Sequence, residues 1–535
     1  MPSKSASKGY LALVLHSHLP FVRHPEYEDC LEEDWLYEAI TETYIPLLRV
    51  FEGLVRDKIA FRLTVSLSPP LVTMLTDALL QQRYVRHIER LIELADKEVR
   101  RTRSTPEFHQ TAQMYLRKFR ECRRYFVDDN RGDLVRVFRD LQESGHLEII
   151  TCSATHGFLP LLNTHPQIVR AQVAIGAKHY ESTFSRRSAG MWNAECGYFP
   201  GLEKFLAAEG VRYFFVDAHG ILYADKPPRY GVFAPLVCDG GVAAFGRDLE
   251  SSRSVWSSEE GYPGDPNYRE FYRDIGYDLD FDYVKPYIHD SGLRISTGIK
   301  YYRITGRGSA NKKSYSERAA TDTARRHAAD FVNSRIEQIE YLAPLMDRPP
   351  IIVAPYDAEL FGHWWYEGPQ FLDQLFRALD KHRGVLEPIT PATYLERHPD
   401  NQWATPSLSS WGNKGYSEVW LEGSNDWIYR HLHKAGERMI QTANRFPQPS
   451  DTQRRLMNQM ARELLLAQSS DWAFIMKTGT MVDYATRRTK DHLLNFNDLC
   501  EQLRSGMLDE TSLGNLESKN KIFPDIDFRV YAADE

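Results

Sequence analysis

Short apolar runs that end in polar, chemically capable residues recur along the first two thirds of the chain. These runs cover residues 10–15, 61–66, 147–151, 190–192, 213–216 and 350–354. Stretches with helical periodicity, such as 200–209 and 322–345, lie between several of them. Alternation of strand, polar tip and helix is typical of a parallel α/β barrel or an open parallel sheet. Because catalytic side chains in such barrels lie at the carboxyl ends of strands, we expect the polar tips to gather in one site.

Two parts of the chain depart from this alternation. Residues 77–143 are highly charged and have helical periodicity, interrupted near Pro106, which predicts a helical insertion between strands. From about Trp403 onward the strand pattern stops, and amphipathic helices are predicted at 426–444, 451–469 and 486–503. We therefore expect a catalytic domain over 1–400, interrupted by the insertion at 77–143, and an α-helical domain over 401–535.

Two further segments, 226–235 and 251–287, are rich in proline, glycine and aromatic residues. Both are too long to be plain connectors between a strand and a helix. Long loops at the mouth of a barrel usually act as lids or as walls of the substrate site, so we expect that role for these segments.

Charge and cysteine content narrow the class of protein. The chain has 535 residues and a net charge of -7, with acidic and basic residues interspersed, which argues against a nucleic-acid surface. The six cysteines are scattered without a C-x-x-C pair, as expected for reduced thiols. The apolar run before His16 is too short for a signal peptide, and no window is long enough to span a membrane. We expect a cytoplasmic protein with neither a membrane nor a nucleic acid as partner.

Two acidic residues at strand tips are the candidate catalytic pair. Glu195 follows the run 190–192 and is bracketed by aromatic residues, and Asp357 follows the run 350–354 ahead of two tryptophans. A carboxylate in aromatic surroundings is either paired or catalytic. Two carboxyl groups from different strands suit the cleavage of a glycosidic bond, and a retaining reaction would place them about 5–5.5 Å apart.

The histidines leave two interpretations open. His16 and His18 are two residues apart on a predicted strand and point to the same side, a geometry that can chelate a metal. His156, Asp217 and His219 could complete such a site, as in a metal-dependent polysaccharide deacetylase. The alternative is that the histidines hydrogen-bond sugar hydroxyls or a carboxylate. Because the chain has no H-E-x-x-H motif and no cysteine cluster, we favour sugar binding without a metal.

Aromatic residues make up 12% of the chain, which fits a carbohydrate groove but also a large core. Trp411 and Trp420 flank a glycine-rich turn, so we expect their rings to be presented and not packed. Asp471, next to Trp472, could bond sugar hydroxyls or cap a helix.

The ordered motifs of the chain resemble those of glycoside hydrolase family 57, and within it the α-1,4-glucan branching enzymes. The matching motifs are 16–20 (HSHLP), 145–151 (GHLEIIT) with 155–157 (THG), 192–197 (WNAECG), 354–362 (APYDAELFG), and 411–420 with 469–472 (SSDW). The resemblance implies a distorted barrel of seven strands, a helical insertion after the second strand, and a C-terminal helical domain that contributes to the active site. It also implies cleavage of an α-1,4 bond and transfer of the donor chain to a 6-hydroxyl of another glucan. A hydrolytic α-amylase and a 4-α-glucanotransferase remain alternatives.

The resemblance further assigns roles to individual residues. It implies that Glu195 is the nucleophile of a retaining double displacement and Asp357 the general acid and base, with no metal or other cofactor. His16, His18 and His156 match histidines of the donor sugar site. The remaining matches to substrate-binding residues are Trp411, Trp420, Asp471, a groove aromatic at Tyr277 or Trp256, and a lid-tip tyrosine at Tyr230. We expect an α-glucan as substrate and a monomer or homodimer.

Overall fold

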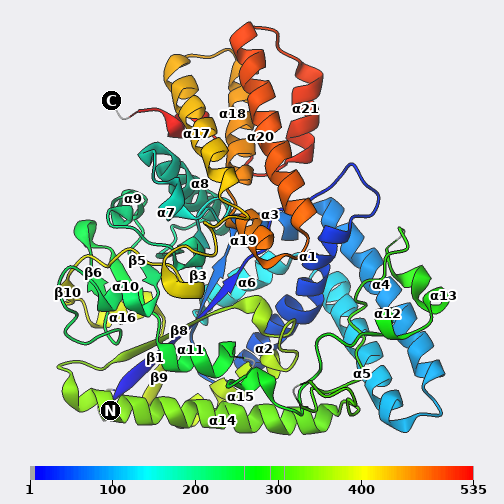
Figure 1. The fold of residues 1–535 in the computed structure, drawn as a ribbon. Coiled ribbons are helices and arrows are strands. Elements are labelled where there is room, and N and C mark those ends of the chain that lie inside the picture. Colours follow the sequence, from blue (N-terminus) through cyan, green and yellow to red (C-terminus); the bar gives the residue numbers. More distant parts are fainter. Residues whose placement is uncertain (1–6, 258, 290, 307, 534–535) are drawn as a thin grey trace.

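The computed structural model describes residues 7–257, 259–289, 291–306 and 308–533. Figure 1 shows a central sheet surrounded by helices, an arm of long helices on one side, and a bundle of helices above the sheet. The N-terminus lies at the start of β1, beside α14, and the C-terminus lies beside the bundle.

Seven parallel strands form the central sheet, in the order β7-β5-β4-β3-β2-β1-β8. The strands are β1 (Gly9–Ser17), β2 (Leu63–Leu67), β3 (Leu147–Cys152), β4 (Gly190–Trp192), β5 (Tyr213–Val216), β6 (Leu236–Val237), β7 (Ala243–Gly246), β8 (Ile351–Asp357), β9 (Leu386–Pro388) and β10 (Gln402–Trp403). The two edges meet where the backbone N–H of Asp248, just after β7, donates to the carbonyl of Val353 in β8 at 2.9 Å. The predicted fold class, a distorted (β/α)7 barrel with helical additions, is confirmed.

Six of the seven barrel strands coincide with the apolar runs of the sequence. All nine residues of β1 are buried, as expected for a central parallel strand covered on both faces. The seventh, β7, and the short strands β6, β9 and β10 lie outside those runs. β6 pairs antiparallel with β7, and β9 pairs with the beginning of β1.

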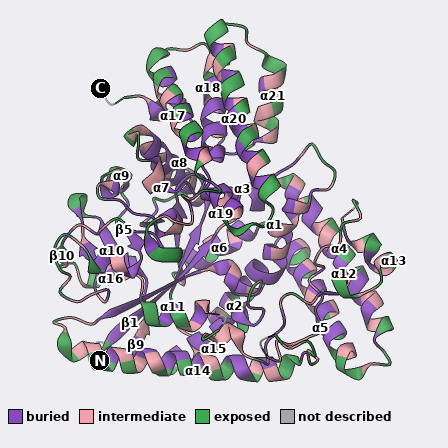
Figure 2. Cartoon of the chain, viewed as in Figure 1, coloured by how far each residue is buried: buried purple, intermediate pink, exposed green. Residues whose placement is uncertain are grey.

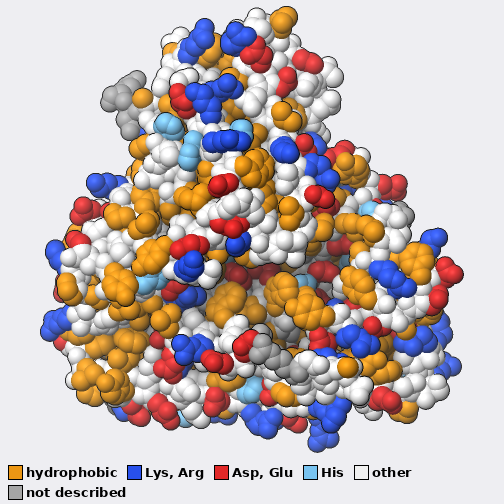
Figure 3. All heavy atoms as spheres, in the orientation of Figure 1, with side chains coloured by type: hydrophobic (Ala, Val, Ile, Leu, Met, Phe, Trp, Pro, Cys, Tyr) orange, Lys and Arg blue, Asp and Glu red, His pale blue; other side chains and the backbone are white. Residues whose placement is uncertain are grey.

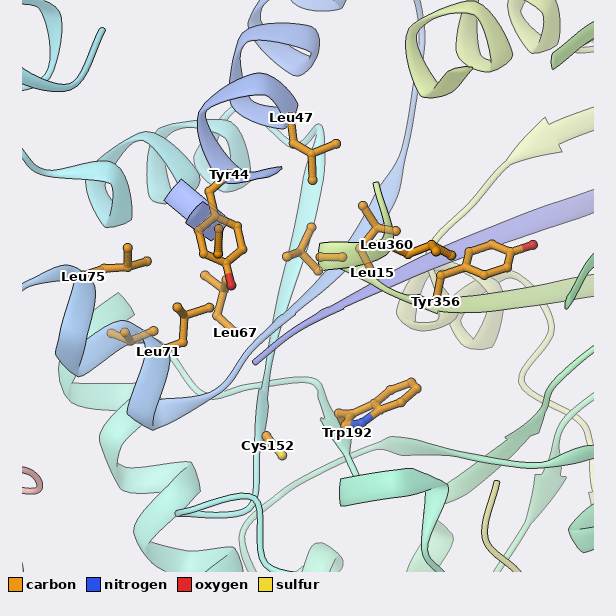
Figure 4. Close-up of a cluster of buried hydrophobic side chains, with 14 of the residues drawn as sticks. Leu15, Tyr44, Leu47, Leu67, Leu71, Leu75, Cys152, Trp192, Tyr356 and Leu360 are labelled. Atoms are coloured by element: carbon orange, nitrogen blue, oxygen red, sulfur yellow. The ribbon is translucent and has the colours of Figure 1, made fainter. Parts of the chain in front are cut away.

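Helices cover the outside of the barrel. They are α1 (Asp34–Ala39), α2 (Ile45–Arg56), α3 (Pro69–Leu75), α6 (Leu134–Glu143), α7 (Leu159–Leu162), α8 (Pro166–Phe184), α9 (Leu202–Ala208), α10 (Ala218–Leu222), α11 (Leu249–Trp256), α14 (Glu317–Leu342), α15 (Gly368–Lys381) and α16 (Pro391–Arg397). Figure 2 shows that the strands and the inward faces of these helices are buried. Figure 4 shows part of this core, where Leu15, Leu67 and Tyr356 come from three neighbouring strands.

The insertion after β2 is helical, as predicted. α4 (Ala78–Arg101) and α5 (Pro106–Arg123) pack side by side as the arm, and α12 (Ile275–Asp278) and α13 (Phe281–Val284) lie beside it. The break near Pro106 is the turn between α4 and α5, and Pro106 occupies the first turn of α5, where its missing N–H costs nothing. α6, the last helix of the predicted insertion, packs on β3 as a barrel helix.

The C-terminal bundle follows the last short strand. It contains α17 (Trp427–Arg445), α18 (Asp451–Ala467), α19 (Ser470–Thr478), α20 (Val482–Ser505) and α21 (Glu510–Lys519). α17, α18 and α20 pack on one another, whereas the start of α19 turns toward the barrel. There Ser469 forms a β-bridge with Gly157, and the Thr155 hydroxyl donates to the carbonyl of Leu465.

The register of the parallel strands places three polar side chains level with one another. His16 in β1 lies level with Ser66 in β2 and with Asp357 in β8. Three polar residues from segments far apart in sequence therefore form one row at the carboxyl ends of adjacent strands. A shift of the register by one residue would turn each of these side chains to the opposite face of the sheet.

Candidate active site

Glu195 is delivered by β4 in a backbone conformation unusual for its residue type. It lies in a short helical turn, Ala194–Cys196, with φ 62° and ψ 25°. A left-handed conformation costs a non-glycine residue about 1–2 kcal/mol. Two backbone bonds hold it, from the Trp411 N–H to the Glu195 carbonyl and from the Cys196 N–H to the Asn193 carbonyl, both 2.9 Å. Strain maintained in this way is typical of residues whose side chains must be aimed.

Both carboxylate oxygens of Glu195 accept hydrogen bonds from the C-terminal part of the chain. The indole Nε1 of Trp411 donates to Oε2 at 2.7 Å, and the Ser470 hydroxyl lies 3.1 Å from Oε1. Burial raises the pKa of Glu195 to about 7, and the charges of Asp357 and Asp471 act in the same direction. The Trp411 and Ser470 bonds oppose that rise, because they favour the ionised carboxylate.

Asp357 is the last residue of β8. Burial raises its pKa to about 8, the neighbouring carboxyl of Glu359 adds to that rise, and Arg247 opposes it. The surroundings of the two carboxyl groups differ, because two donors stabilise an ionised Glu195 whereas the neighbouring carboxyl of Glu359 favours a protonated Asp357. Two carboxyl groups in such different environments suit a nucleophile and a general acid. The separation of about 5–5.5 Å between the two carboxyl groups stays a prediction.

Three histidines stack beside the carboxylates. The ring centroids of His18 and His156 are 3.8 Å apart, and His16 lies between His156 and Trp192, at 4.9 and 4.7 Å. Burial lowers the pKa of His16 and of His156 well below the usual value, and the neighbouring imidazoles add to the effect. His16 and His156 are therefore neutral.

Asp471, at the start of α19, approaches the histidines from the bundle. Its Oδ2 lies 2.9 Å from His18 Nε2. Burial alone would raise the pKa of Asp471, but the interaction with His18, together with His156 and Ser469, lowers it to about 2. Asp471 is thus ionised at the edge of the site.

The residues that could hold a metal are fewer than the sequence suggested. Potential ligand atoms of His18, His156 and Asp471 lie within 4.8 Å of one another, and two imidazoles with a carboxylate form a donor set that transition metals accept. Asp217 instead binds Arg247 at 2.5 Å, and His219 hydrogen-bonds the Gly415 carbonyl. The suggestion that these two complete a metal site with the other histidines is wrong.

Trp411 and Trp256 lie together at the site. Their rings meet edge to face at 5.8 Å, and Trp411 also meets Trp192 at 5.1 Å. The expectation that Trp411 and Trp420 present their rings is wrong, because Trp411 is 8% exposed and Trp420 is 1% exposed. Trp420 stacks on Phe158 at 4.7 Å. The glycine-rich turn after Trp411 leads the chain back into the core.

Tyr277 and Tyr230 are not brought to the catalytic pair. Tyr277 lies on α12 and is 53% exposed. Tyr230 packs between Arg229 and Arg348, with ring-to-guanidinium distances of 5.0 and 5.9 Å.

The lid role expected of Tyr230 is wrong, because its loop lies at the other end of the barrel. Three residues after Tyr230, the Phe233 carbonyl accepts from the N–H of Ile351, the first residue of β8. Asp357 is the last residue of that strand, about 20 Å away along β8.

Several residues that the sequence analysis did not single out complete the site. Ser470 contacts Glu195, Arg247 faces Asp357, and the Glu359 carboxylate accepts from the Tyr44 hydroxyl and from the His18 backbone N–H. Ser470 and Glu359 lie inside quoted motifs, so their closeness to Asp471 and Asp357 in sequence was the available signal.

An aromatic platform is formed between the loop after β8 and the segment before α12. We use this name for the rings of Trp364 and Phe271, which stack at 4.5 Å. Trp364 is 57% exposed, and its backbone N–H donates to the Glu359 carbonyl, two residues from Asp357. Tyr272, 78% exposed, meets Phe271 edge to face. Figure 3 shows hydrophobic side chains gathered around a hollow below the bundle.

Two family models match the chain. The model described as glycosyl hydrolase family 57 matches residues 12–406, and the model described as 1,4-alpha-glucan branching enzyme, C-terminal, matches residues 431–531.

Relatives and solved structures agree with these matches. The chain is 33% identical to the 1,4-alpha-glucan branching enzyme TK1436 of Thermococcus kodakarensis, over 96% of the chain and 77% of that protein. It is 48% identical to the α-amylase AmyC of Thermotoga maritima, with a TM-score of 0.92 over 98% of the chain and 99% of that structure. It is 31% identical to the branching enzyme of Pyrococcus horikoshii, with a TM-score of 0.88 over 99% and 97%.

Proposed function

Because the chain belongs to glycosyl hydrolase family 57, we propose that it is a 1,4-α-glucan branching enzyme. It cleaves an α-1,4 bond of a glucan with retention and rejoins the donor chain through a new α-1,6 bond. The observation that carries the retaining chemistry is the pair of partly buried carboxyl groups, Glu195 just after β4 and Asp357 at the end of β8. The match of the branching-enzyme C-terminal model to residues 431–531 supports transfer to a 6-hydroxyl.

In the first step, the Glu195 carboxylate attacks the anomeric carbon while the Asp357 carboxyl donates its proton to the departing 4-oxygen. A covalent glucosyl ester on Glu195 and a shortened glucan result. In the second step, the ionised Asp357 takes the proton of an acceptor 6-hydroxyl, whose oxygen attacks the anomeric carbon and releases Glu195. Configuration is inverted twice and is therefore retained.

The residues around the pair bind the donor sugar. Asp471 offers its carboxylate oxygens to sugar hydroxyls, and the imidazoles of His16, His18 and His156, whose nitrogens already have protein partners, form the wall behind it. Trp411 and Trp256 offer apolar ring surface to the C–H faces of glucose. Trp420 packs on Phe158, two residues after His156.

Transfer to a sugar needs a bound acceptor. An oriented intramolecular attack is worth about 7–11 kcal/mol relative to an unbound reactant, and this preference allows a sugar to compete with water. The aromatic platform, with Trp364 on the loop that follows Asp357 and Phe271 on the segment before α12, is a ring surface suited to this task. Tyr277 could extend it along the exposed surface.

A hydrolytic α-amylase is the second candidate, and the 48% identity to AmyC favours it. Both activities share the glucosyl ester and differ only in whether water or a 6-hydroxyl attacks it. A 4-α-glucanotransferase would use a 4-hydroxyl.

Proton NMR of amylose digests separates the three activities. Branching predicts new α-1,6 signals that outnumber new reducing ends. Reducing ends without α-1,6 signals would identify an amylase, and altered α-1,4 chain lengths with neither change would identify a 4-α-glucanotransferase. The Glu195→Gln variant is the matched control and should be inactive in every case.

The cellular setting is also a proposal. We place the enzyme in the cytoplasm, acting in glycogen biosynthesis as a monomer or homodimer. All six cysteines are unpaired, which fits a reducing compartment. Throughout the described parts of the chain, every helix is too short or too polar to cross a bilayer.

We further propose the domain division at residue 400, with the insertion at 77–143. It is supported by the two family models, which end at residue 406 and begin at residue 431.

A further inference from the structure

A continuous row of hydrogen bonds leads from β2 to Glu195. The Ser66 hydroxyl lies 3.1 Å from His16 Nδ1, and His16 Nε2 lies 2.9 Å from His156 Nε2. His156 Nδ1 lies 2.8 Å from the Ser470 hydroxyl, which lies 3.1 Å from Glu195 Oε1. Ser66, His16, His156 and Ser470 are all buried.

The nucleophile role requires an ionised Glu195, and this state fixes the direction of every bond in the row. A carboxylate only accepts, so the Ser470 hydroxyl must donate to it. A hydroxyl has one hydrogen, so Ser470 in turn accepts from His156 Nδ1–H. The contact between the two Nε2 atoms needs one hydrogen, which His16 must supply because His156 has used its own at Nδ1. His16 Nδ1 then accepts from Ser66.

We propose that Ser66, His16, His156 and Ser470 form a single directed hydrogen-bond chain that holds the nucleophile Glu195 ionised in its buried site. Ser66 and Ser470 are positioning residues, since they act through Glu195. The inference deepens the proposed function and rests on Glu195 being the nucleophile.

The hydrogen-bond chain acts on both steps of the reaction. Before attack, it offsets the burial that would otherwise protonate Glu195. When the acceptor attacks the glucosyl ester, the Ser470 hydroxyl again donates to the departing carboxylate, so charge forms where a donor is already aimed. Bonds in such a row polarise one another, which allows Ser66 to influence a carboxylate it does not touch.

Other charged groups face Glu195 and set the background for its titration. Asp357 from β8 and Asp471 from α19 favour its protonated form, and Trp411 favours the ionised form. Arg247, after β7, acts on Asp357, as does Glu359. His18 belongs to a separate branch, in which its ring bonds Ser68 and Asp471.

Removing the Ser66 hydroxyl, the first group of the hydrogen-bond chain, tests the proposal. Ser66→Ala should shift the acid limb of the pH profile of kcat/KM to higher pH by about half a unit, and Ser66→Thr should restore its position. Ser470→Ala should shift the acid limb to higher pH by about one unit or more, because a hydrogen bond to a charged group is lost. Thr64→Val is the matched control. Thr64 is a buried neighbour on β2 whose hydroxyl has no partner among the described residues, so the limb should not move.

A readout without turnover separates this inference from the proposed function. Infrared titration of the Glu195 carboxyl, as the difference between each protein and its Glu195→Gln counterpart, measures its protonation even if no glucan is processed. We expect the midpoint to rise in Ser66→Ala and Ser470→Ala and to stay in Thr64→Val. A Ser66→Ala titration curve that superimposes on that of the parent protein would overturn the proposal of a directed hydrogen-bond chain. An equal rise of the midpoint in Thr64→Val would overturn it as well.

Discussion

The two carboxyl groups of the site are held where ionisation is unfavourable, so catalysis and stability conflict at single residues. Burial raises the pKa of Asp357 from its ordinary 3.8 to about 8. For a group with a raised folded-state pKa, the stabilising contribution is complete below the unfolded value and is lost as pH rises through the folded value. Asp357 therefore penalises the folded protein increasingly from about pH 4 to about pH 8.

Asp357→Asn should accordingly stabilise the protein more at pH 8 than at pH 5, by a few kcal/mol at the higher pH. Denaturant unfolding at both pH values measures the difference. Asp483→Asn, at an exposed position on α20, is the control and should show no growing gain. An Asp357→Asn gain that is equal at the two pH values would argue that Asp357 is not buried as an uncharged acid.

The hydrogen bonds of the histidine cluster predict that the enzyme does not need a metal ion. The nitrogens of His18 and His156 already have partners in Ser68, Asp471, Ser470 and His16. We expect dialysis against a strong chelator to leave glucan transfer unchanged. Loss of activity that added Zn²⁺ restores would instead identify His18, His156 and Asp471 as metal ligands and favour the deacetylase chemistry.

At the scale of elements, the sequence revealed the strands better than it revealed the loops. The runs before Glu195 and Asp357 are strongly apolar and end at polar tips, so β4 and β8 were identifiable. β7 is four residues, AAFG, without a β-branched side chain, so it gave no such signal. Composition also does not say at which end of a barrel a loop lies, which is why Tyr230 was misplaced.

The candidate site was only partly predictable for a similar reason. Motif residues such as Glu195 and His156 were found because their types are chemically distinctive. The pairing of Ser66 with His16 depends on strand register across 50 residues, and that of Ser470 with Glu195 depends on how the bundle docks. Neither is encoded in local spacing.

The loops that carry Trp364 and Tyr230 lie at opposite ends of the barrel, so substitutions in them should affect glucan transfer differently. Trp364→Ala removes the exposed ring of the aromatic platform, so the ratio of α-1,6 bonds formed to reducing ends released should fall several-fold. Tyr230→Ala, at the opposite end of the barrel, should leave that ratio unchanged. NMR of amylose digests measures both. An unchanged ratio in Trp364→Ala, or a fall in Tyr230→Ala, would contradict the assignment of the acceptor side.

At the scale of the whole molecule, the site is shared between the barrel and the part of the chain beyond residue 400. Trp411, Ser470 and Asp471 reach the barrel residues Glu195 and His18. The junction next to them is the bond from the Thr155 hydroxyl to the Leu465 carbonyl, which joins the loop after β3 to α18.

Weakening this junction should therefore affect chemistry more than folding. Thr155→Val should lower kcat about tenfold with a smaller change in KM, because small displacements of catalytic groups are costly. Thr155→Ser keeps the hydroxyl and should recover most of the rate. Steady-state kinetics on amylose would test this, and a Thr155→Val enzyme with unchanged kcat would show that the junction does not position the site.

Trapping the covalent intermediate tests the assignment of Glu195 most directly. Asp357→Asn, incubated with α-maltotriosyl fluoride, can form the glucosyl ester because fluoride leaves without acid assistance, but it lacks the base for the second step. Peptide mass spectrometry should then find one maltotriosyl group on the peptide that contains Glu195. An unmodified Glu195, or a sugar attached to another residue, would contradict the double displacement proposed for this enzyme.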